Sequence, residues 1–501
     1  MAKRVAVIDI GSNSIRMVVY EKTSRYAFHL LHEEKSKVRI SQDAYKHNGE
    51  LQTIPMQRTF DALSDFLSIA NSFKVRKILC VATSALRDAP NKQEFIQKVK
   101  HKLKLNIKVI NGEREAYFGA IACANLLPQQ KNALSIDIGG GSTEFAFIDK
   151  DSVTHTLSLK LGTVRLKELF FDKNDIKGAT TYIDKELEKL PDTSKLTTLI
   201  GIGGTFRAIS NAILKESLYP LNKIHGFEYN IKTFKEYLKR LIKAKDAKEL
   251  QALFIKNNRF DVIKPGTLIL QRVINKININ HIITSGVGVR EGVYLADLLR
   301  SSKDKFPHNY NTSVRYILDS YIQDKAFSNN LSALTKKIFD LSAGYFGIDY
   351  KYKKLLSIAA KLYPAGSSVH FYSQNKHTYY IIQSALEYGF SHQDIMLIST
   401  LTKYAKNRLP SETHLQLYAK LLPENIHIIH SLSYMFSLSI ALLSHRPRNI
   451  DFTMQFSKGE LHIISKSKCY IAHNAVTKLE CKDKQFKVVF LKSLSHSKLK
   501  V

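Results

Sequence analysis

The pattern of apolar and polar positions repeats once in the first part of the chain. Residues 5–19 read VAVIDIGSNSIRMVV, and residues 133–147 read ALSIDIGGGSTEFAF. Each copy is an apolar strand, a turn of Gly, Ser or Asn, and a second apolar strand, which predicts a β-hairpin with a glycine-rich tip. Without gaps, Asp9 aligns with Asp137 at the end of the first strand. Two similar halves that each open with such a hairpin predict a duplicated α/β domain with a cleft between the halves.

The periodicity of the remaining sequence predicts further elements. An apolar stripe at helical spacing covers 56–73. Asn91 with Glu94, and Thr233 with Glu236, have the spacing of a capping pair that opens a helix. The other predicted elements are helices over 92–103 and 113–127, a helix ending at Leu299, and strands over 77–82, 107–110, 198–202 and 281–284.

These patterns divide the chain into five segments. The polar run before residue 312 is typical of a linker, and the long stretch after it is helical in period. The expected segments are two halves of the duplicated domain (1–118 and 119–300), a linker (301–311), a helical domain (312–450) and a basic, strand-containing end (451–501).

The last segment combines apolar alternation with positive charge. From Lys466 to Val501 there are nine lysines and two acidic residues, which indicates either a solvated face or a patch that binds polyanions. Short strands are predicted where apolar residues alternate, at Leu461/Ile463, Tyr470/Ile471 and Val488/Val489/Phe490.

Composition narrows the class of protein. A chain of 501 residues is too long for one core, so two to four domains are expected. Its net charge of +31 would attract polyanions, although a biased composition explains the charge equally well. The four scattered cysteines imply no disulfide framework, which favours the cytoplasm. We expect no membrane partner and no sequence-specific nucleic acid.

The two turns have the residues that phosphate loops need. Glycine lacks Cβ, so successive backbone N–H groups can converge on one anion, and serine and asparagine add side-chain donors. One such turn would be read as a plain hairpin tip, but two matched copies predict phosphate binding. The predicted phosphate-binding residues are Gly11, Ser12, Asn13 and Ser14 in the first turn, and Gly139, Gly140, Gly141 and Ser142 in the second.

Three acidic residues flank these turns. Asp9 and Asp137 end the first strand of each hairpin, and Glu144 lies seven residues after Asp137, across the second hairpin. Magnesium is held by a few carboxylates together with waters and phosphate oxygens. The alternative is that each aspartate caps its own turn. We expect Mg²⁺, or another divalent cation, at Asp137 and Glu144. For Asp9, contact with the metal and capping of its own turn are equal alternatives.

The motifs resemble those of a known family. The paired turns are similar to those of the actin, sugar-kinase and Hsp70-type fold, a duplicated ribonuclease H-like α/β architecture with an interdomain cleft. More narrowly, the chain resembles the exopolyphosphatase / guanosine pentaphosphate phosphohydrolase family. The stretches that carry the resemblance, in family order, are VIDIGSNSIRMVV (7–19), ATSALRDAPN (82–91), VINGEREAYFGA (109–120), SIDIGGGSTEF (135–145), LGTVRL (161–166), GIGGTFRA (201–208), NRFDVIKPG (258–266) and SGVGVREGVY (285–294).

The resemblance implies catalytic roles. The family's base for the attacking water is the glutamate of a Gly-x-x-Glu-Ala stretch, which corresponds to Glu115 here. Many relatives have two adjacent glutamates, whereas this chain has Arg114 at the first position, and Glu113 is the substitute candidate. From the residues alone, Glu115 would instead be a glutamate that complements the helix dipole.

Arginines and a glycine turn complete the expected site. Arg87 matches a family arginine that faces the substrate phosphate, and a guanidinium can hold two phosphate oxygens. Without the resemblance, Arg87 would be a surface arginine paired with Asp88 or Glu94. A weaker prediction places Arg16, Gly203, Gly204, Thr205 and Arg207 in the substrate wall. For the last four, a strand-to-helix turn that serves packing alone is an equal alternative.

The helical segment resembles the family's HD-like domain in a degenerate form. Relatives have a His-Asp pair in this segment, but here the matching stretch reads Leu362-Tyr363-Pro364-Ala365-Gly366. Metal chemistry is therefore not expected there, and His370 and His377 are expected to be structural. The domain would help to bind a polyanion or form a homodimer.

The resemblance leaves several functions open. The chain is expected to hydrolyse terminal phosphate from inorganic polyphosphate, from guanosine pentaphosphate, or from both, with guanosine tetraphosphate as a possible further ligand. The same fold supports ATPases and kinases, for which Ser285–Gly288 lies where an adenosine site would be. A non-catalytic sensor of polyphosphate or the guanosine nucleotide is the third alternative.

Overall fold

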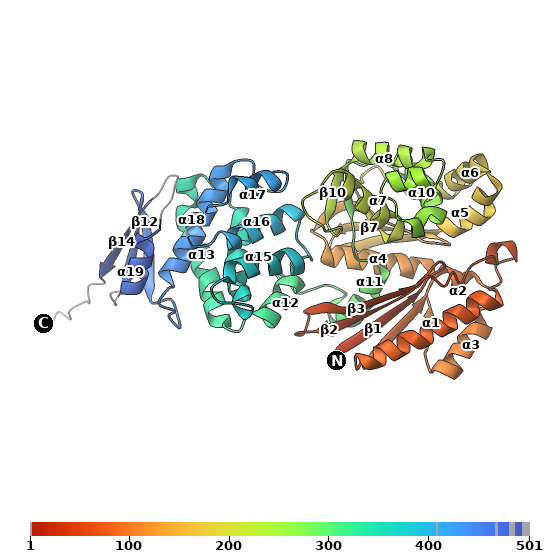
Figure 1. Cartoon of the computed structure of the whole chain (residues 1–501), viewed down its shortest axis with the longest axis horizontal. Helices are drawn as coiled ribbons and strands as arrows, with labels where there is room; N and C mark the ends of the chain where they lie inside the picture. Colours follow the sequence, from red (N-terminus) through yellow and green to blue (C-terminus); the bar gives the residue numbers. More distant parts are fainter. Residues whose placement is uncertain (1–2, 407–408, 466–468, 480–485, 493–501) are drawn as a thin grey trace. The chain divides into compact units, whose positions relative to one another are not determined.

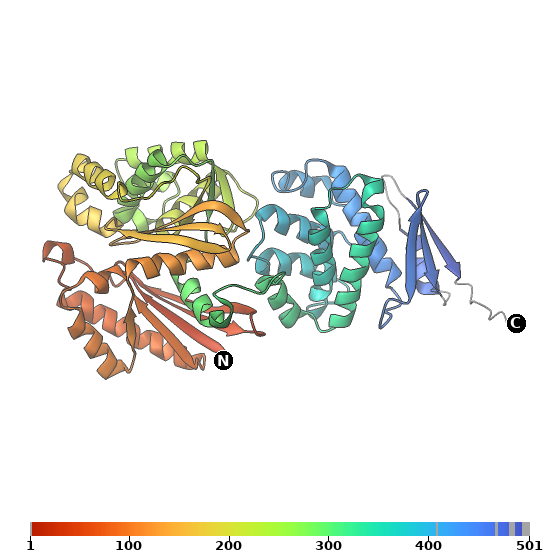
Figure 2. The same ribbon diagram turned by 180° about the vertical axis from the view of Figure 1, so that it is seen from behind.

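The chain folds into two compact units. The computed structural model describes residues 3–406, 409–465, 469–479 and 486–492, and it divides the chain into Met1–Asn311 and Thr312–Val501 (Figures 1 and 2). The expected fold class, a duplicated α/β domain followed by helices and a small sheet, is confirmed. Among the described residues, no helix has the length and apolarity needed to cross a membrane.

The first half of unit 1 is a five-stranded mixed sheet of order β3-β2-β1-β4-β5. The first three strands are antiparallel, and β4 and β5 continue parallel to β1. The central strand β1 is almost entirely apolar because both of its faces are covered. Its strands are β1 (Arg4–Ile10), β2 (Ile15–Lys22), β3 (Phe28–Ser36), β4 (Lys77–Ala82) and β5 (Ile107–Val109).

The second half repeats this arrangement in a six-stranded sheet of order β10-β11-β9-β6-β7-β8. Strands β6, β7 and β8 are antiparallel like β1 to β3, and β9 and β11 run parallel to β6. The predicted hairpins are therefore β1–β2 and β6–β7, at equivalent places in the two sheets. Its strands are β6 (Gln130–Ile138), β7 (Thr143–Lys150), β8 (Ser152–Leu159), β9 (Thr198–Ile202), β10 (Phe227–Asn230) and β11 (His281–Thr284).

Two helices each pack against elements of the other half. Helix α4 (Gly112–Leu126) follows the first sheet but packs on β6, β7 and β8, while α11 (Val289–Leu298) ends the second half and packs on α4 and β1. Figure 1 shows α4 between the two sheets. A Cβ at Gly292 would lie 1.8 Å from the Phe118 carbonyl oxygen, so glycine is required for this helix contact. The boundary expected between residues 118 and 119 falls inside α4.

Other helices cover the outer faces of the sheets. In the first half, Leu63 and Phe66 of α1 pack into the apolar core with Phe95 of α3. The unit 1 helices not yet named are α1 (Thr53–Ser72), α2 (Ser84–Asp88), α3 (Lys92–Leu103), α5 (Thr163–Leu169), α6 (Ile176–Leu187), α7 (Gly203–Glu216), α8 (Ile231–Lys243), α9 (Ala247–Ala252) and α10 (Phe260–Lys276), with the 3-10 turns η1 (Ala44–Lys46), η2 (Phe171–Lys173), η3 (Asn257–Arg259) and η4 (Arg300–Ser302).

Unit 2 is a set of packed helices followed by a three-stranded sheet of order β12-β13-β14. In the degenerate HD-like segment, Lys403 Nζ lies 3.3 Å from Nδ1 of the buried His414, whose Nε2 lies 2.9 Å from Thr400 Oγ1. Its elements are α12 (Thr312–Tyr321), α13 (Lys325–Phe346), α14 (Tyr352–Leu362), η5 (Tyr363–Ser368), α15 (Gln374–Ala385), α16 (His392–Lys403), α17 (Glu412–Leu417), α18 (Ile426–Leu442), β12 (Phe452–Ser457), β13 (Glu460–Ser465), α19 (Tyr470–Thr477) and β14 (Lys487–Lys492).

Three local predictions were wrong. The Asn91 side chain does not cap α3 but exchanges hydrogen bonds with the Leu51 backbone. Helix α8 is capped by Asn230 rather than Thr233. Tyr470 and Ile471 open helix α19 instead of a strand. Much of the lysine-rich end, including 493–501, lies outside the described residues.

Candidate active site

The tips of the two hairpins meet. Each turn is closed in the same way, by a hydrogen bond from Gly11 N to Ser14 O at 3.3 Å and from Gly139 N to Ser142 O at 2.9 Å. A Cβ at Gly140 would lie 2.8 Å from Cβ of Ser12, so the second loop can approach the first this closely only with glycine there. The two predicted phosphate loops therefore face each other.

One cavity in unit 1 is lined by both loops. Its walls are strongly polar, with carboxylates and guanidinium groups on facing elements. The lining residues used below are Asp9, Gly11, Ser12, Asn13, Ser14, Arg16, Glu115, Asp137, Gly139, Gly140, Glu144, Gly203, Gly204, Arg207, Arg259, Arg290 and Glu291.

Asp137 and Glu144 form an acidic pair on the second hairpin. They are opposite each other in the β6–β7 register, so their side chains lie on the same face. Burial raises the pKa of Asp137 to about 6, with Arg207 opposing the shift, and burial raises the pKa of Glu144 to about 7. Ser158 Oγ donates to Glu144 Oε1 at 2.9 Å. Gly203, at φ +82°, leaves room for Asp137, since a Cβ there would lie 2.1 Å from Oδ1.

Asp9 faces a different partner. It is opposite Arg16 in the β1–β2 register, and burial raises the pKa of its carboxyl group against the pull of Arg290 and Arg16. Among the described residues, Asp9 Oδ1 is a buried oxygen without a hydrogen-bond partner. A buried carboxylate oxygen without a donor is a position that a cation or a bound water can satisfy.

The acidic residues fit a hard divalent cation. Within the described part of the chain, Asp9, Asp137 and Glu144 do not form a group of three spaced to hold an ion by themselves. This arrangement suits Mg²⁺, which keeps several waters and is commonly bound by one or two carboxylates and substrate phosphates. The unpaired Asp9 oxygen and the raised pKa values of Asp137 and Glu144 indicate that positive charge would stabilise the site.

Glu115 enters the cavity from the start of α4. Asn111 caps this helix by accepting a hydrogen bond from Arg114 N at 2.8 Å, which fixes its first turn. Glu115 is buried and lines the cavity, whereas Glu113 of the same turn is exposed. Burial and the nearby Glu144 carboxylate raise the pKa of Glu115 well above its usual value, while Arg87 opposes the shift.

Arg87 connects the two halves behind the cavity wall. Its Nη1 donates to Glu115 Oε2 at 2.9 Å, and its Nη2 donates to Ser142 Oγ at 3.3 Å. Arg165 reinforces this connection, because it donates to the Gly141 carbonyl at 2.9 Å and to Asp88 Oδ2 at 3.1 Å. The guanidinium of Arg87 therefore holds the orientation of the Glu115 carboxylate relative to the second loop.

Some predicted residues lie outside the cavity lining. These include Arg87, Gly141 and Ser142, although Arg87 donates hydrogen bonds to the lining residue Glu115 and to Ser142. Thr205 is fully buried against Gly266 of α10, where a Cβ on that glycine would lie 2.7 Å from Thr205 Oγ1. His370 is exposed and His377 is half-buried on unit 2.

Three more arginines line the cavity: Arg207, which was weighed with the glycine turn for the substrate wall, and Arg259 and Arg290, which were not among the predicted site residues. Arg207 donates to the Gly203 carbonyl at 3.1 Å, and Arg290 donates to Glu33 Oε1 at 2.7 Å. Arg259 lies against Gly204, and its Nε is buried without a hydrogen-bond partner among the described residues. All three occur in the motif stretches 201–208, 258–266 and 285–294, but these motifs assigned no role to Arg259 or Arg290.

Comparison with protein families and curated proteins gives consistent matches. The model of the Ppx/GppA phosphatase family matches residues 18–301, and the model of Ppx/GppA phosphatase, domain III, matches residues 311–485. The chain is 27% identical over 418 residues to a guanosine-5'-triphosphate,3'-diphosphate pyrophosphatase of Vibrio parahaemolyticus, covering 81% of each chain. It is 33% identical over 298 residues to the bifunctional 3-dehydroquinate synthase/phosphatase of Fusobacterium nucleatum, a match that spans only 44% of that protein.

Solved structures show the same architecture. An exopolyphosphatase from Cytophaga hutchinsonii has a TM-score of 0.55 at 26% identity and covers 60% of this chain and 100% of its own. The Ppx/GppA family member of Aquifex aeolicus has a TM-score of 0.52 at 29% identity, covering 60% of this chain and 99% of its own.

Proposed function

This chain belongs to the Ppx/GppA phosphatase family, and we propose that it is a magnesium-dependent hydrolase of terminal phosphoanhydride bonds. Its substrates would be inorganic polyphosphate, guanosine pentaphosphate at its 5′ end, or both. The observation that carries this proposal is that two glycine-rich hairpin tips face one cavity into which the buried carboxylate of Glu115 also projects.

The loops would hold the terminal phosphate. Backbone N–H groups of Ser12–Ser14 and Gly140, with the Ser12 and Asn13 side chains, would offer hydrogen-bond donors from opposite sides, since the N–H groups of Gly11 and Gly139 close their own turns. Such donors act without rearrangement when negative charge develops on the phosphoryl oxygens. Phosphoryl transfer needs mainly positioning and charge neutralisation, so no covalent nucleophile is required.

Asp137 and Glu144 would hold Mg²⁺, and Asp9 is a third candidate ligand. When bound, the cation would neutralise charge on the phosphate oxygens. The acidic pair would be ionised in that state, because a nearby positive charge favours the charged form of a carboxylate. Ser158, which donates to Glu144, keeps that carboxylate in place.

Glu115 would act as the base. Its carboxylate would accept a proton from the water that attacks the terminal phosphorus, and a raised pKa brings a carboxylate closer to the neutral range in which a general base is effective. Arg87 orients this carboxylate and can also reach a phosphate next to Ser142. The remaining arginines of the cavity, Arg16, Arg207, Arg259 and Arg290, would bind the phosphates beyond the cleaved bond.

Phosphate release tests the proposal. The purified chain would be incubated with Mg²⁺ and, separately, with polyphosphate, guanosine pentaphosphate or ATP at equal concentration, and initial rates would be compared. We expect turnover of one or both of the first two substrates, lost on chelation and restored by Mg²⁺. Preferential turnover of ATP would indicate an ATPase instead, and tight binding of polyphosphate or guanosine pentaphosphate without turnover would indicate a sensor.

A further inference from the structure

Three side chains of kinds that bind metals come together in unit 2, in segments for which the sequence predicted no metal site. They are His445, Asp451 and Cys469, and one potential ligand atom from each lies within 4.8 Å of the other two. Imidazole nitrogen, carboxylate oxygen and thiolate sulfur are the ligands that proteins use for zinc. Magnesium prefers oxygen alone, so this group differs in chemistry from the carboxylates of unit 1.

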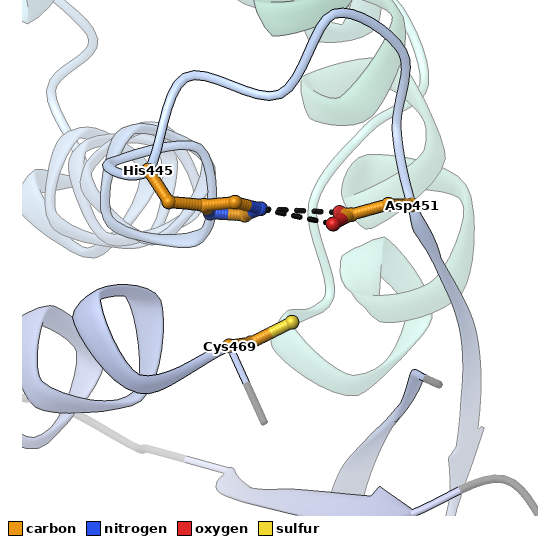
Figure 3. A group of neighbouring side chains, drawn as sticks. All are labelled: His445, Asp451 and Cys469. Carbon is orange, nitrogen blue, oxygen red and sulfur yellow. Dashed lines mark hydrogen bonds and ion pairs between the residues drawn. The ribbon is translucent and has the colours of Figure 1, made fainter. Parts of the chain in front are cut away.

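The three residues come from separate segments. His445 follows the end of α18, Asp451 immediately precedes β12, and Cys469 immediately precedes α19. His445 Nε2 lies 3.1 and 3.2 Å from the two carboxylate oxygens of Asp451. Figure 3 shows these two side chains pointing at each other. The Cys469 sulfur lies below them in the view and points toward the space beneath their contact.

A simple His–Asp hydrogen bond leaves part of this arrangement unexplained. Among the described residues, His445 Nδ1 is buried and has no hydrogen-bond partner. The Cys469 thiol is buried beside the pair, where its Sγ donates to Ser465 Oγ at 3.3 Å. The backbone is left-handed at Cys469 (φ 43°) and at Arg446 (φ 51°), next to His445. Such conformations are uncommon for residues other than glycine and recur at ligand clamps.

We propose that His445, Asp451 and Cys469 bind one zinc-like divalent cation, with water as the fourth ligand. Zinc–ligand bonds of about 2.0–2.3 Å place tetrahedral ligand atoms about 3.5 Å apart. The two most separated ligand atoms of the group would therefore move about 1 Å closer together when the ion binds. The thiol loses its proton to solvent as the metal–sulfur bond forms. The bound ion ties the end of α18 to the sheet β12-β13-β14 and to α19, and it takes no part in the hydrolysis.

Metal titration of the full-length chain tests this site. The chain, stripped by a chelator and supplied with saturating Mg²⁺ to occupy the carboxylates of unit 1, would be titrated with Zn²⁺ against a chromophoric competitor. We expect one equivalent bound by the wild-type chain, and binding at least about 10-fold weaker in His445→Ala and Cys469→Ser. Co²⁺ in place of Zn²⁺ would show a thiolate-to-metal charge-transfer absorption in the wild type and not in Cys469→Ser.

A second histidine provides the matched control. His462 Nε2 lies 3.0 Å from Glu460 Oε2, and within the described residues this pair has no third metal ligand beside it. His462→Ala should therefore bind Zn²⁺ like the wild type. Thermal unfolding of each metal-free variant would verify that it is folded. The proposal is overturned if Cys469→Ser keeps the wild-type stoichiometry and affinity, or if the wild-type cobalt complex lacks the thiolate absorption.

Discussion

The two hairpins of unit 1 have the same backbone but opposite charge arrangements. In the first, Asp9 is opposite Arg16, whereas in the second the equivalent positions hold Asp137 opposite Glu144. The first hairpin thus balances its own charge, while the second has two buried carboxylates whose pKa values are raised to about 6 and about 7. From this one exchange of residue type we infer that both tips bind phosphate, that the second hairpin supplies the principal cation ligands, and that Arg16 adds phosphate binding on the first.

Between the two hairpins, loss of the acid on the second should have the larger effect on activity. Glu144→Gln keeps the size of the side chain and its contact with Ser158 but removes a charge that would hold Mg²⁺. Since a metal supplies several kcal/mol of charge stabilisation, we expect kcat to fall by about 100-fold or more, as measured by phosphate release. Glu186→Gln is the control, because Glu186 is also buried but lies outside the cavity. An unchanged kcat in Glu144→Gln would remove the cation from this hairpin.

Loss of the arginine on the first hairpin should act on substrate binding. A hydrogen bond to a charged group contributes about 1.5–3 kcal/mol, so Arg16→Gln should raise KM by about 10- to 100-fold with a smaller change in kcat. Arg272→Gln, at an ion pair with Asp184 outside the cavity, should change neither constant. A fall in kcat at constant KM would contradict the division between the hairpins.

The acidic pair should also reduce stability when no cation is present. The pKa of Asp137 is about 6 in the folded chain against an ordinary value of 3.8, so the folded state binds more protons and stability falls as pH rises from about 4 to 6. At pH 8 without Mg²⁺, Asp137→Asn should stabilise unit 1 by on the order of 2 kcal/mol in denaturant unfolding. Asp184→Asn is the control, and a destabilised Asp137→Asn would contradict the predicted cost of burying the Asp137 carboxylate.

The smallest expected effect is a shift in the pH dependence of kcat/KM. Because Glu144 and Glu115 must be ionised and both have raised pKa values, kcat/KM should fall as pH decreases through about 7 at low Mg²⁺. Higher Mg²⁺ favours the ionised forms, so the acidic midpoint should move to lower pH by up to about one unit. A midpoint that does not depend on Mg²⁺ would place the titrating group away from the cation.

The sequence predicted the repeated parts of unit 1 well, because central strands such as β4 and β9 are continuous apolar runs bounded by turns. The prediction of local structure failed where tertiary contacts determine it. Asn91 forms hydrogen bonds with the Leu51 backbone, and Tyr470 opens a helix. The Gly-x-x-Glu-Ala motif singled out Glu115, which lines the cavity, whereas Arg259 and Arg290 were not assigned roles. Their place in the cavity depends on how η3 and α11 pack in the tertiary structure, which no local pattern records.

The most direct test of the site compares two glutamates of one helical turn. Glu115 is buried in the cavity and Glu113 is exposed, so Glu115→Gln and Glu113→Gln differ only in where the charge is removed. Single-turnover phosphate release, with substrate affinity measured separately, should show Glu115→Gln slowed by about 100- to 10,000-fold with binding nearly unchanged, and Glu113→Gln close to wild type. A wild-type rate in Glu115→Gln would contradict the account.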